Sequence, residues 1–130
     1  MNAEHILQKA NKLNHFSIIK MLISEGLLNY NTTKHIFITA VNYGNLVLLK
    51  FFIDSGKVDL GVEDNLAIKY SSLSGYTDIV KLLLESDKVD PRDLDNYAER
   101  IANKKGHTEI VELLKNWSKK WNSNYRQKNL

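Results

Sequence analysis

The sequence contains no cysteine among its 130 residues. This absence excludes disulfide bonds, thiolate metal sites and cysteine nucleophiles, and it fits a reducing compartment inside a cell. Long apolar runs are also missing, since no stretch approaches the roughly 20 apolar residues that a membrane-spanning helix needs. Charges at Glu4, Lys9 and Lys12 interrupt the first residues, so we expect neither a signal peptide nor a membrane anchor. The predicted location is intracellular and cytoplasmic.

Motifs for catalysis and for metal binding are absent as well. The six glycines are dispersed and form no phosphate-binding loop. The histidines occur singly, never in a two-ligand motif, as His5, His15, His35 and His107. A zinc site needs three or four converging ligands, so we expect no metal, no cofactor and no catalytic residue. The sequence predicts a protein that is not an enzyme.

The composition is that of an ordinary globular domain, with 43% hydrophobic and 25% charged residues. The chain is short for two independent domains, so one folded unit is expected. We also expect the protein to be a monomer. The net charge of +3 is unevenly distributed. From Lys115 onward the sequence has several cations and no acid, so the tail is basic while the rest is nearly neutral.

A repeat of 31 residues is visible in the sequence. Gly44, Gly75 and Gly106 are each followed by a similar apolar segment, and Asn14 takes the glycine position in a degenerate upstream copy. The apolar segment is typical of a short helix that is buried on more than one side. Thr77 is a predicted N-cap of that helix, as is the corresponding Thr108.

A shorter helical segment precedes each of these positions. The four predicted segments are 6–13, 36–43, 66–73 and 97–104. A small residue recurs at one position of each, as Ala10, Ala40, Ser71 and Ala102. Small side chains allow helices of adjacent copies to approach closely. Each copy is thus predicted to be a helix, a glycine turn, a second helix and a linker, and it is stabilised by stacking on its neighbours.

The segment from Gly106 to Leu114, Gly-His-Thr-Glu-Ile-Val-Glu-Leu-Leu, resembles the second-helix signature of ankyrin repeats, and Gly75 to Leu84 is a close variant. The resemblance implies an all-α, ankyrin-type solenoid of helical hairpins with about four repeats. Its predicted bounds are residues 1–115, with repeats at approximately 5–31, 35–62, 66–93 and 97–115, followed by a basic aromatic cap or tail at 116–130. Asn65 to Ser72 and the Lys-Val-Asp-Pro linker are also similar to ankyrin-repeat proteins of giant amoeba-infecting viruses, which would place the chain in a host cytoplasm.

The sequence departs from the family pattern in two ways. The family usually opens its first helix with Thr-Pro-Leu-His, whereas the matching positions begin at Leu66 and Tyr97 with other residues. The polar clamp made by that Thr and His is therefore absent. The repeat is also shorter than the usual 33 residues, so we expect stunted, turn-like finger loops.

The resemblance implies a protein partner that binds finger loops and the exposed ends of the first helices on the concave side. The matching positions, which differ between copies, are Asn42, Tyr43, Val62, Glu63, Asn65, Leu73, Ser74, Asp93, Leu94, Asn96, Lys104 and Lys105. Neutral variation of solvent-facing residues is the alternative interpretation. The apolar members Tyr43, Val62, Leu73 and Leu94 are the strongest candidates for contact with a protein.

The tail combines aromatic and basic residues. Its candidate residues are Trp117, Lys119, Lys120, Trp121, Tyr125 and Arg126. A continued helix would align the three aromatic residues on one stripe. Such a helix could cover the apolar end of the last repeat as a cap, or bind nucleic acid or an acidic partner, and a disordered tail is the third alternative. An adaptor role in host ubiquitin ligation is possible by resemblance alone.

Overall fold

The described part of the chain is entirely helical. In the computed structural model, which describes residues 16–86 and 88–128, seven helices follow one another and no strand occurs. They are α2 (Phe16–Ser24), α3 (Tyr30–Asn42), α4 (Leu46–Ser55), α5 (Val62–Ser74), α6 (Thr77–Glu85), α7 (Asp93–Lys104) and α8 (Thr108–Lys128). The predicted all-α fold is confirmed. The predicted helix 6–13, with Ala10 and Asn14, lies outside the described residues.

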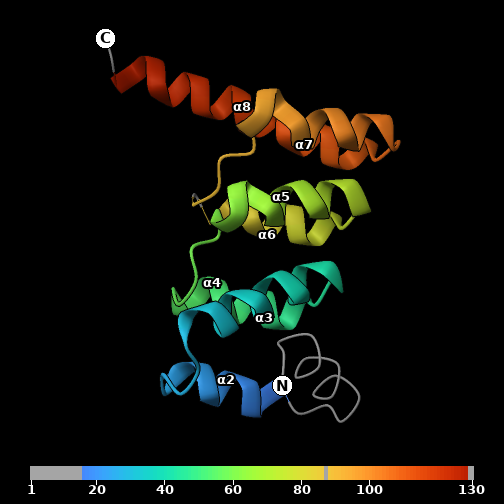
Figure 1. The fold of residues 1–130 in the computed structure, drawn as a ribbon. Coiled ribbons are helices and arrows are strands. Elements are labelled where there is room, and N and C mark those ends of the chain that lie inside the picture. Colours follow the sequence, from blue (N-terminus) through green and yellow to red (C-terminus); the bar gives the residue numbers. More distant parts are fainter. Residues whose placement is uncertain (1–15, 87, 129–130) are drawn as a thin grey trace.

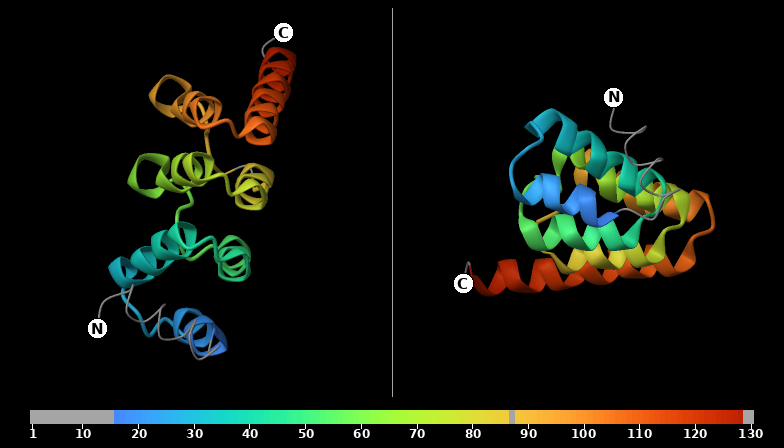
Figure 2. Two further views of the ribbon diagram at one scale, coloured as in Figure 1. Left: turned by 90° about the vertical axis from the view of Figure 1, so that its right-hand side faces the viewer. Right: turned by 90° about the horizontal axis from the view of Figure 1, so that it is seen from below.

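The helices form stacked hairpins. α3 pairs with α4, α5 with α6, and α7 with α8 (Figure 1). The first helices α3, α5 and α7 contact one another in one column, and α2, α4, α6 and α8 form a second column beside it (Figure 2). No finger hairpin projects from the linkers within the described residues, which confirms the prediction of short loops.

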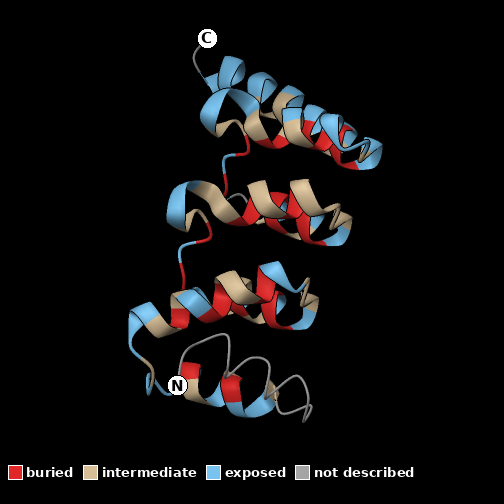
Figure 3. Ribbon diagram, turned by 45° about the vertical axis from the view of Figure 1, so that its right-hand side comes forward, coloured by how far each residue is buried: buried red, intermediate tan, exposed pale blue. Residues whose placement is uncertain are grey.

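The core lies between the two columns and between successive hairpins (Figure 3). Residues at the same place in each repeat are buried together, as with Leu48, Ile79 and Ile110 in the second helices. The small residues Ala40, Ser71 and Ala102 are likewise fully buried in the first helices. Each buried Leu or Ile stabilises the fold by about 1.5–3 kcal/mol relative to an exposed one. Because the buried residues form one cluster that runs through hairpins in contact with one another, stability comes from the stacking.

The glycine turns allow the hairpins to approach closely. Gly44 and Gly75 have φ values of 66° and 80°, which glycine adopts without steric cost. The ring of Tyr76 lies against Gly44, and the ring of His107 lies against Gly75. A methyl group on Gly75 would be 2.7 Å from His107 Cε1. The absence of a side chain therefore makes room for the next repeat.

The helix N-termini differ from the prediction. Thr77 is the first residue of α6, its N-cap position is occupied by Tyr76, and no side chain caps the helix. α8 likewise begins at Thr108, so the N-cap assignment of both threonines was wrong. The side chain of Asn45 instead caps α4, where its Oδ1 accepts a hydrogen bond from Leu48 N. Tyr76 replaces this residue in the next repeat because its ring packs on Gly44.

The last repeat carries polar residues where the preceding repeat is apolar. Ile68 of α5 is fully buried, whereas Glu99 holds the corresponding position in α7. Leu84 of α6 is buried, whereas Lys115 is exposed in α8. These substitutions let the end of the stack contact water. A terminal repeat with a polar outer face is what a solenoid requires for solubility.

Candidate protein-interaction surface

The linkers enter the first helices α5 and α7 through a left-handed turn. Residues Glu63 to Asn65 have φ values of 56°, 56° and 62°, and residues Leu94 to Asn96 have values of 51°, 54° and 59°. Such values cost roughly 1–2 kcal/mol per residue for a side chain other than glycine, with Asn and Asp the most tolerant. Three successive residues of this kind recur at the 31-residue spacing, so α5 and α7 share this entry, whereas α3 begins without it.

The turn before α5 is tied to the preceding first helix. Lys34 Nζ of α3 lies 2.8 Å from Glu63 Oε1. The hydrogen bond from Lys34 and its positive charge lower the pKa of Glu63. Glu63, a predicted partner-binding residue, therefore bridges two repeats within the chain.

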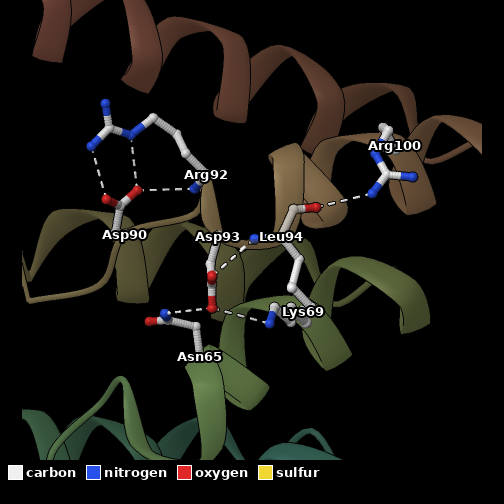
Figure 4. Close-up of polar contacts among 7 residues, drawn as sticks. All are labelled: Asn65, Lys69, Asp90, Arg92, Asp93, Leu94 and Arg100. Atoms are coloured by element: carbon white, nitrogen blue, oxygen red, sulfur yellow. Dashed lines mark hydrogen bonds and ion pairs between the residues drawn. The ribbon is translucent and has the colours of Figure 1, made fainter.

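The turn before α7 is held in a similar way (Figure 4). Asp93 Oδ2 accepts a hydrogen bond from Asn65 Nδ2 at 3.3 Å and pairs with Lys69 Nζ at 3.2 Å. The bond from Asn65, followed by the bond from Lys69, lowers the pKa of Asp93. Two predicted site residues, Asn65 and Asp93, thus contact each other. Their polar groups are partly used in joining the repeats.

Leu94 is the most exposed apolar residue of this turn. Its side chain is 63% exposed, while its backbone carbonyl accepts a hydrogen bond from Arg100 Nη2 at 3.0 Å (Figure 4). Arg100 Nε also donates to the carbonyl of Asp95. Val62, at the start of α5, is half-buried and packs against the core. Leu94 is therefore the apolar side chain that a partner would reach first at this end.

The opposite end of the first helices carries the other predicted residues. Asn42, Tyr43, Lys104 and Lys105 are exposed there, and Leu73 and Ser74 are half-buried. The backbone of the same end is fixed by the following repeat. Tyr76 Oη donates to the carbonyl of Asn42 at 3.1 Å, and His107 Nε2 lies 3.1 Å from the carbonyl oxygen of Leu73. Rigid backbone thus presents side chains that differ between repeats.

The predicted residues therefore form two groups, one at the linker ends of α5 and α7 and the other at the turn ends of α3, α5 and α7. Figure 1 shows these helices one above another. The linker-end group contains Val62, Glu63, Asn65, Asp93, Leu94 and Asn96, and the turn-end group contains Asn42, Tyr43, Leu73, Ser74, Lys104 and Lys105. Between them lie residues that the sequence interpretation missed, such as Lys69 and Arg100. Ile38, Lys69 and Arg100 occupy the same position in successive copies of the repeat. Because their side chains differ from copy to copy, comparison of the copies could have identified this position. We call the two groups and the residues between them the first-helix surface.

The tail continues the second helix of the last repeat. α8 runs without interruption to Lys128, so residues 116–128 are helical and the alternative of a disordered tail does not hold for them. Trp117 is half-buried and packs against the core, and the Trp121 and Tyr125 rings stack 5.2 Å apart. Arg92, from the linker before α7, lies 3.7 Å from the Trp121 ring centre. The exposed side chains of α8 include Lys119, Lys120 and Arg126.

Groups suited to metal binding do not occur among residues 16–86 and 88–128, where no three His, Asp or Glu side chains converge. His35 is exposed, and His107 packs on a glycine turn. His5 and His15 lie outside these ranges. In the same part of the chain no helix is long and apolar enough to cross a membrane.

The family comparison agrees with this architecture. Residues 5–95 match the family described as ankyrin repeats in three copies. Because the match covers more than half of the chain, the protein belongs to the ankyrin-repeat family. Ankyrin repeats are generally protein–protein interaction modules and are typically not catalytic.

One curated relative comes from a giant virus of amoebae. The chain is 31% identical over 79 residues to a putative ankyrin repeat protein of Acanthamoeba polyphaga mimivirus. This confirms the predicted similarity to ankyrin-repeat proteins of giant amoeba viruses. The aligned region is 61% of this chain and 12% of the relative, so the chain spans a small part of that protein's length. No solved structure matches the chain.

Proposed function

We propose that the chain binds a partner protein through the first-helix surface and performs no chemistry itself. The observation that supports this proposal is the contrast between two sets of positions. Buried positions keep their character from repeat to repeat, as in Ala40, Ser71 and Ala102. The neighbouring turn-end positions change completely, from Asn42 to Leu73 to Lys104. A rigid stack with a varied outer edge is suited to recognise one partner shape.

Two exposed apolar side chains are the proposed anchors. Tyr43 is 53% exposed at the turn end, and Leu94 is 63% exposed at the linker end. Tyrosines that a partner desolvates are frequent hot spots of binding energy in interfaces. An exposed leucine adds apolar area whose burial favours binding. The charged residues around them would favour some partners over others and would raise the rate of association. The similarity to a protein of an amoeba virus supports a site of action in a host cytoplasm.

Comparison of two variants tests this surface. In the first, Tyr43→Ala and Leu94→Ala remove the proposed anchors. In the matched control, Met21→Ala and Val47→Ala remove two equally exposed apolar side chains from the second column. Both variants should keep the helical circular dichroism of the parent chain. Tagged proteins are then used to capture partners from cells that naturally produce the chain.

The proposal predicts that a partner captured by the parent chain is lost with the first variant and retained with the control. Equal recovery with both variants would reject the first-helix surface. Loss with the control alone would place the binding site on the second helices instead.

A further inference from the structure

A groove lies on the second column, and none of the residues named for the first-helix surface lines it. Its walls are the C-terminal half of α6, the linker that follows it and the C-terminal half of α8, and its volume is about 940 Å³. The groove exists because α8 continues past the length of the other second helices (Figure 2). Without residues 116–128 this side of the hairpin stack would have no second wall.

The aromatic wall of the groove is held in place by the linker. The Arg92 guanidinium lies 3.7 Å from the centre of the Trp121 ring and 5.6 Å from that of Trp117. Asp90 fixes this guanidinium through two hydrogen bonds, from Nε at 2.9 Å and from Nη2 at 2.8 Å (Figure 4). The stack of Trp121 on Tyr125 extends the wall toward the C-terminus. Such preordered rings lose little entropy when a ligand binds.

The charges that line the groove are unbalanced. Lys88, Lys120 and Lys128 line it, and none of them forms an ion pair with another described residue. Asp90, a further lining residue, is neutralised by Arg92. Glu85 is the other acidic residue that lines the groove, and it forms no ion pair with a described residue. An excess of positive charge beside an apolar wall is complementary to a ligand with both acidic and apolar groups.

We propose that this groove binds an acidic segment of a protein, with apolar side chains interspersed among its carboxylates. The apolar side chains pack against the lining residues Tyr125 and Leu113, and the carboxylates pair with the lysines. This site is separate from the first-helix surface and does not depend on the function proposed above. The chain would thus have two binding sites, and the groove would select acidic segments whereas the first-helix surface relies on exposed apolar side chains.

Two features favour a peptide over a nucleic acid. A base that stacks on Trp121 must compete with the guanidinium of Arg92, which already covers that ring at 3.7 Å. Glu85 is exposed in the groove and would repel a chain that has a phosphate at every nucleotide. A peptide can place an apolar or amide group beside Glu85 and direct its carboxylates to the lysines.

The two tryptophans of the chain, Trp117 and Trp121, both line the groove and provide the measurement. The full chain is titrated with the synthetic peptide acetyl-Glu-Asp-Leu-Glu-Phe-Asp-Glu-amide while tryptophan fluorescence is recorded. Two variants of equal net charge are compared. Lys88→Glu with Lys120→Glu reverses charges inside the groove, and Lys115→Glu with Lys119→Glu reverses exposed charges outside it. A single-stranded oligonucleotide is titrated in parallel.

The proposal predicts saturable binding of the peptide, with Kd raised about tenfold or more by the groove variant and changed less than about threefold by the other. Equal weakening in both variants would show that attraction is diffuse and would overturn the site. Absence of binding to the peptide would overturn it as well. Binding of the oligonucleotide in preference to the peptide would assign the groove to nucleic acid instead.

Discussion

The His107 ring lies on Gly75, and its Nε2 atom is 3.1 Å from the carbonyl oxygen of Leu73. The preceding repeat shows the same arrangement, since the Tyr76 ring lies on Gly44 and its hydroxyl donates to the carbonyl of Asn42. In both cases an aromatic ring of the following repeat closes the glycine turn of the repeat before it. The contact fixes the turn-end part of the first-helix surface.

This arrangement predicts a difference between two glycines. Gly75 and Gly106 have φ values of 80° and 78°, but only at Gly75 would a methyl group meet another residue within 4 Å. Gly106→Ala should cost about 1 kcal/mol of stability, because the strain is in the backbone alone. Gly75→Ala should cost about 2 kcal/mol or more, because the His107 ring must also move. Urea denaturation followed by circular dichroism measures both, and equal losses would mean that the ring contact contributes nothing.

Two adjacent buried serines should respond differently to replacement by alanine. Ser71 and Ser72 are both fully buried in α5. Ser71 Oγ donates to the Ala67 carbonyl at 2.7 Å, whereas Ser72 Oγ has no hydrogen-bond partner among the described residues. Ser72→Ala should raise the free energy of unfolding by about 1 kcal/mol, because an unpaired hydroxyl is removed.

Ser71→Ala is the control. It should be neutral or lower the free energy of unfolding by up to about 1 kcal/mol, because it removes a satisfied hydroxyl. Destabilisation by Ser72→Ala in the same denaturation experiment would indicate that its hydroxyl is hydrogen-bonded in solution.

The left-handed turn before α5 predicts a stabilising glycine. Asp64 is exposed and has a φ of 56°, a conformation that glycine adopts without steric cost. Asp64→Gly should stabilise the protein by up to about 1 kcal/mol. Lys50→Gly, at an exposed position inside α4, should destabilise it by about 1 kcal/mol. Thermal denaturation measures the change in stability of each variant, which should be a gain for Asp64→Gly and a loss for Lys50→Gly. A loss of stability in both variants would contradict the left-handed conformation of the turn.

The ion pairs between repeats predict how stability depends on pH. The pKa of Asp93 is lowered from 3.8 by the hydrogen bond from Asn65 and then by Lys69. Its ionised form therefore stabilises the fold above pH 3.8, and this contribution is lost as the pH falls below 3.8 through the lowered value. The difference in stability between the parent chain and Asp93→Asn should accordingly shrink on acidification.

NMR titration of the Asp93 carboxyl carbon checks the cause of this shift. Asn65→Ala and Lys69→Met should each raise the pKa of Asp93 toward 3.8. A titration curve that neither variant changes would show that the contacts of Asp93 with Asn65 and Lys69 drawn in Figure 4 do not form in solution.

The sequence predicted the features that depend on local pattern. The spacing of Gly44, Gly75 and Gly106 located the turns, because positive φ favours glycine at all three positions and a neighbouring ring lies close to Gly44 and Gly75. The predicted bounds 66–73 and 97–104 match the right-handed parts of α5 and α7, which follow the left-handed residues. α3 begins at Tyr30, earlier than the predicted 36, because Asn29 caps it.

Other features could not be read from local pattern. Three successive positive φ values at Glu63 to Asn65 oppose the ordinary preference of these residues, and contacts between repeats such as Lys34 with Glu63 help to hold them. The Arg92 stack on Trp121 joins residues that are far apart in the sequence. The division of the first-helix surface into two ends depends on the direction of the helices. Recognition of Thr77 as an N-cap failed because Tyr76 takes that position in order to pack on Gly44.

Site-specific photo-crosslinking inside producing cells tests most directly whether a partner protein binds the first-helix surface. A benzophenone amino acid is placed in the full chain at Tyr43, at Leu94 or, as a control on the second column, at Val47. We expect the first two positions to become crosslinked to the same protein and the control position to remain without this crosslink. Crosslinks from Val47 alone, with none from Tyr43 or Leu94, would contradict it.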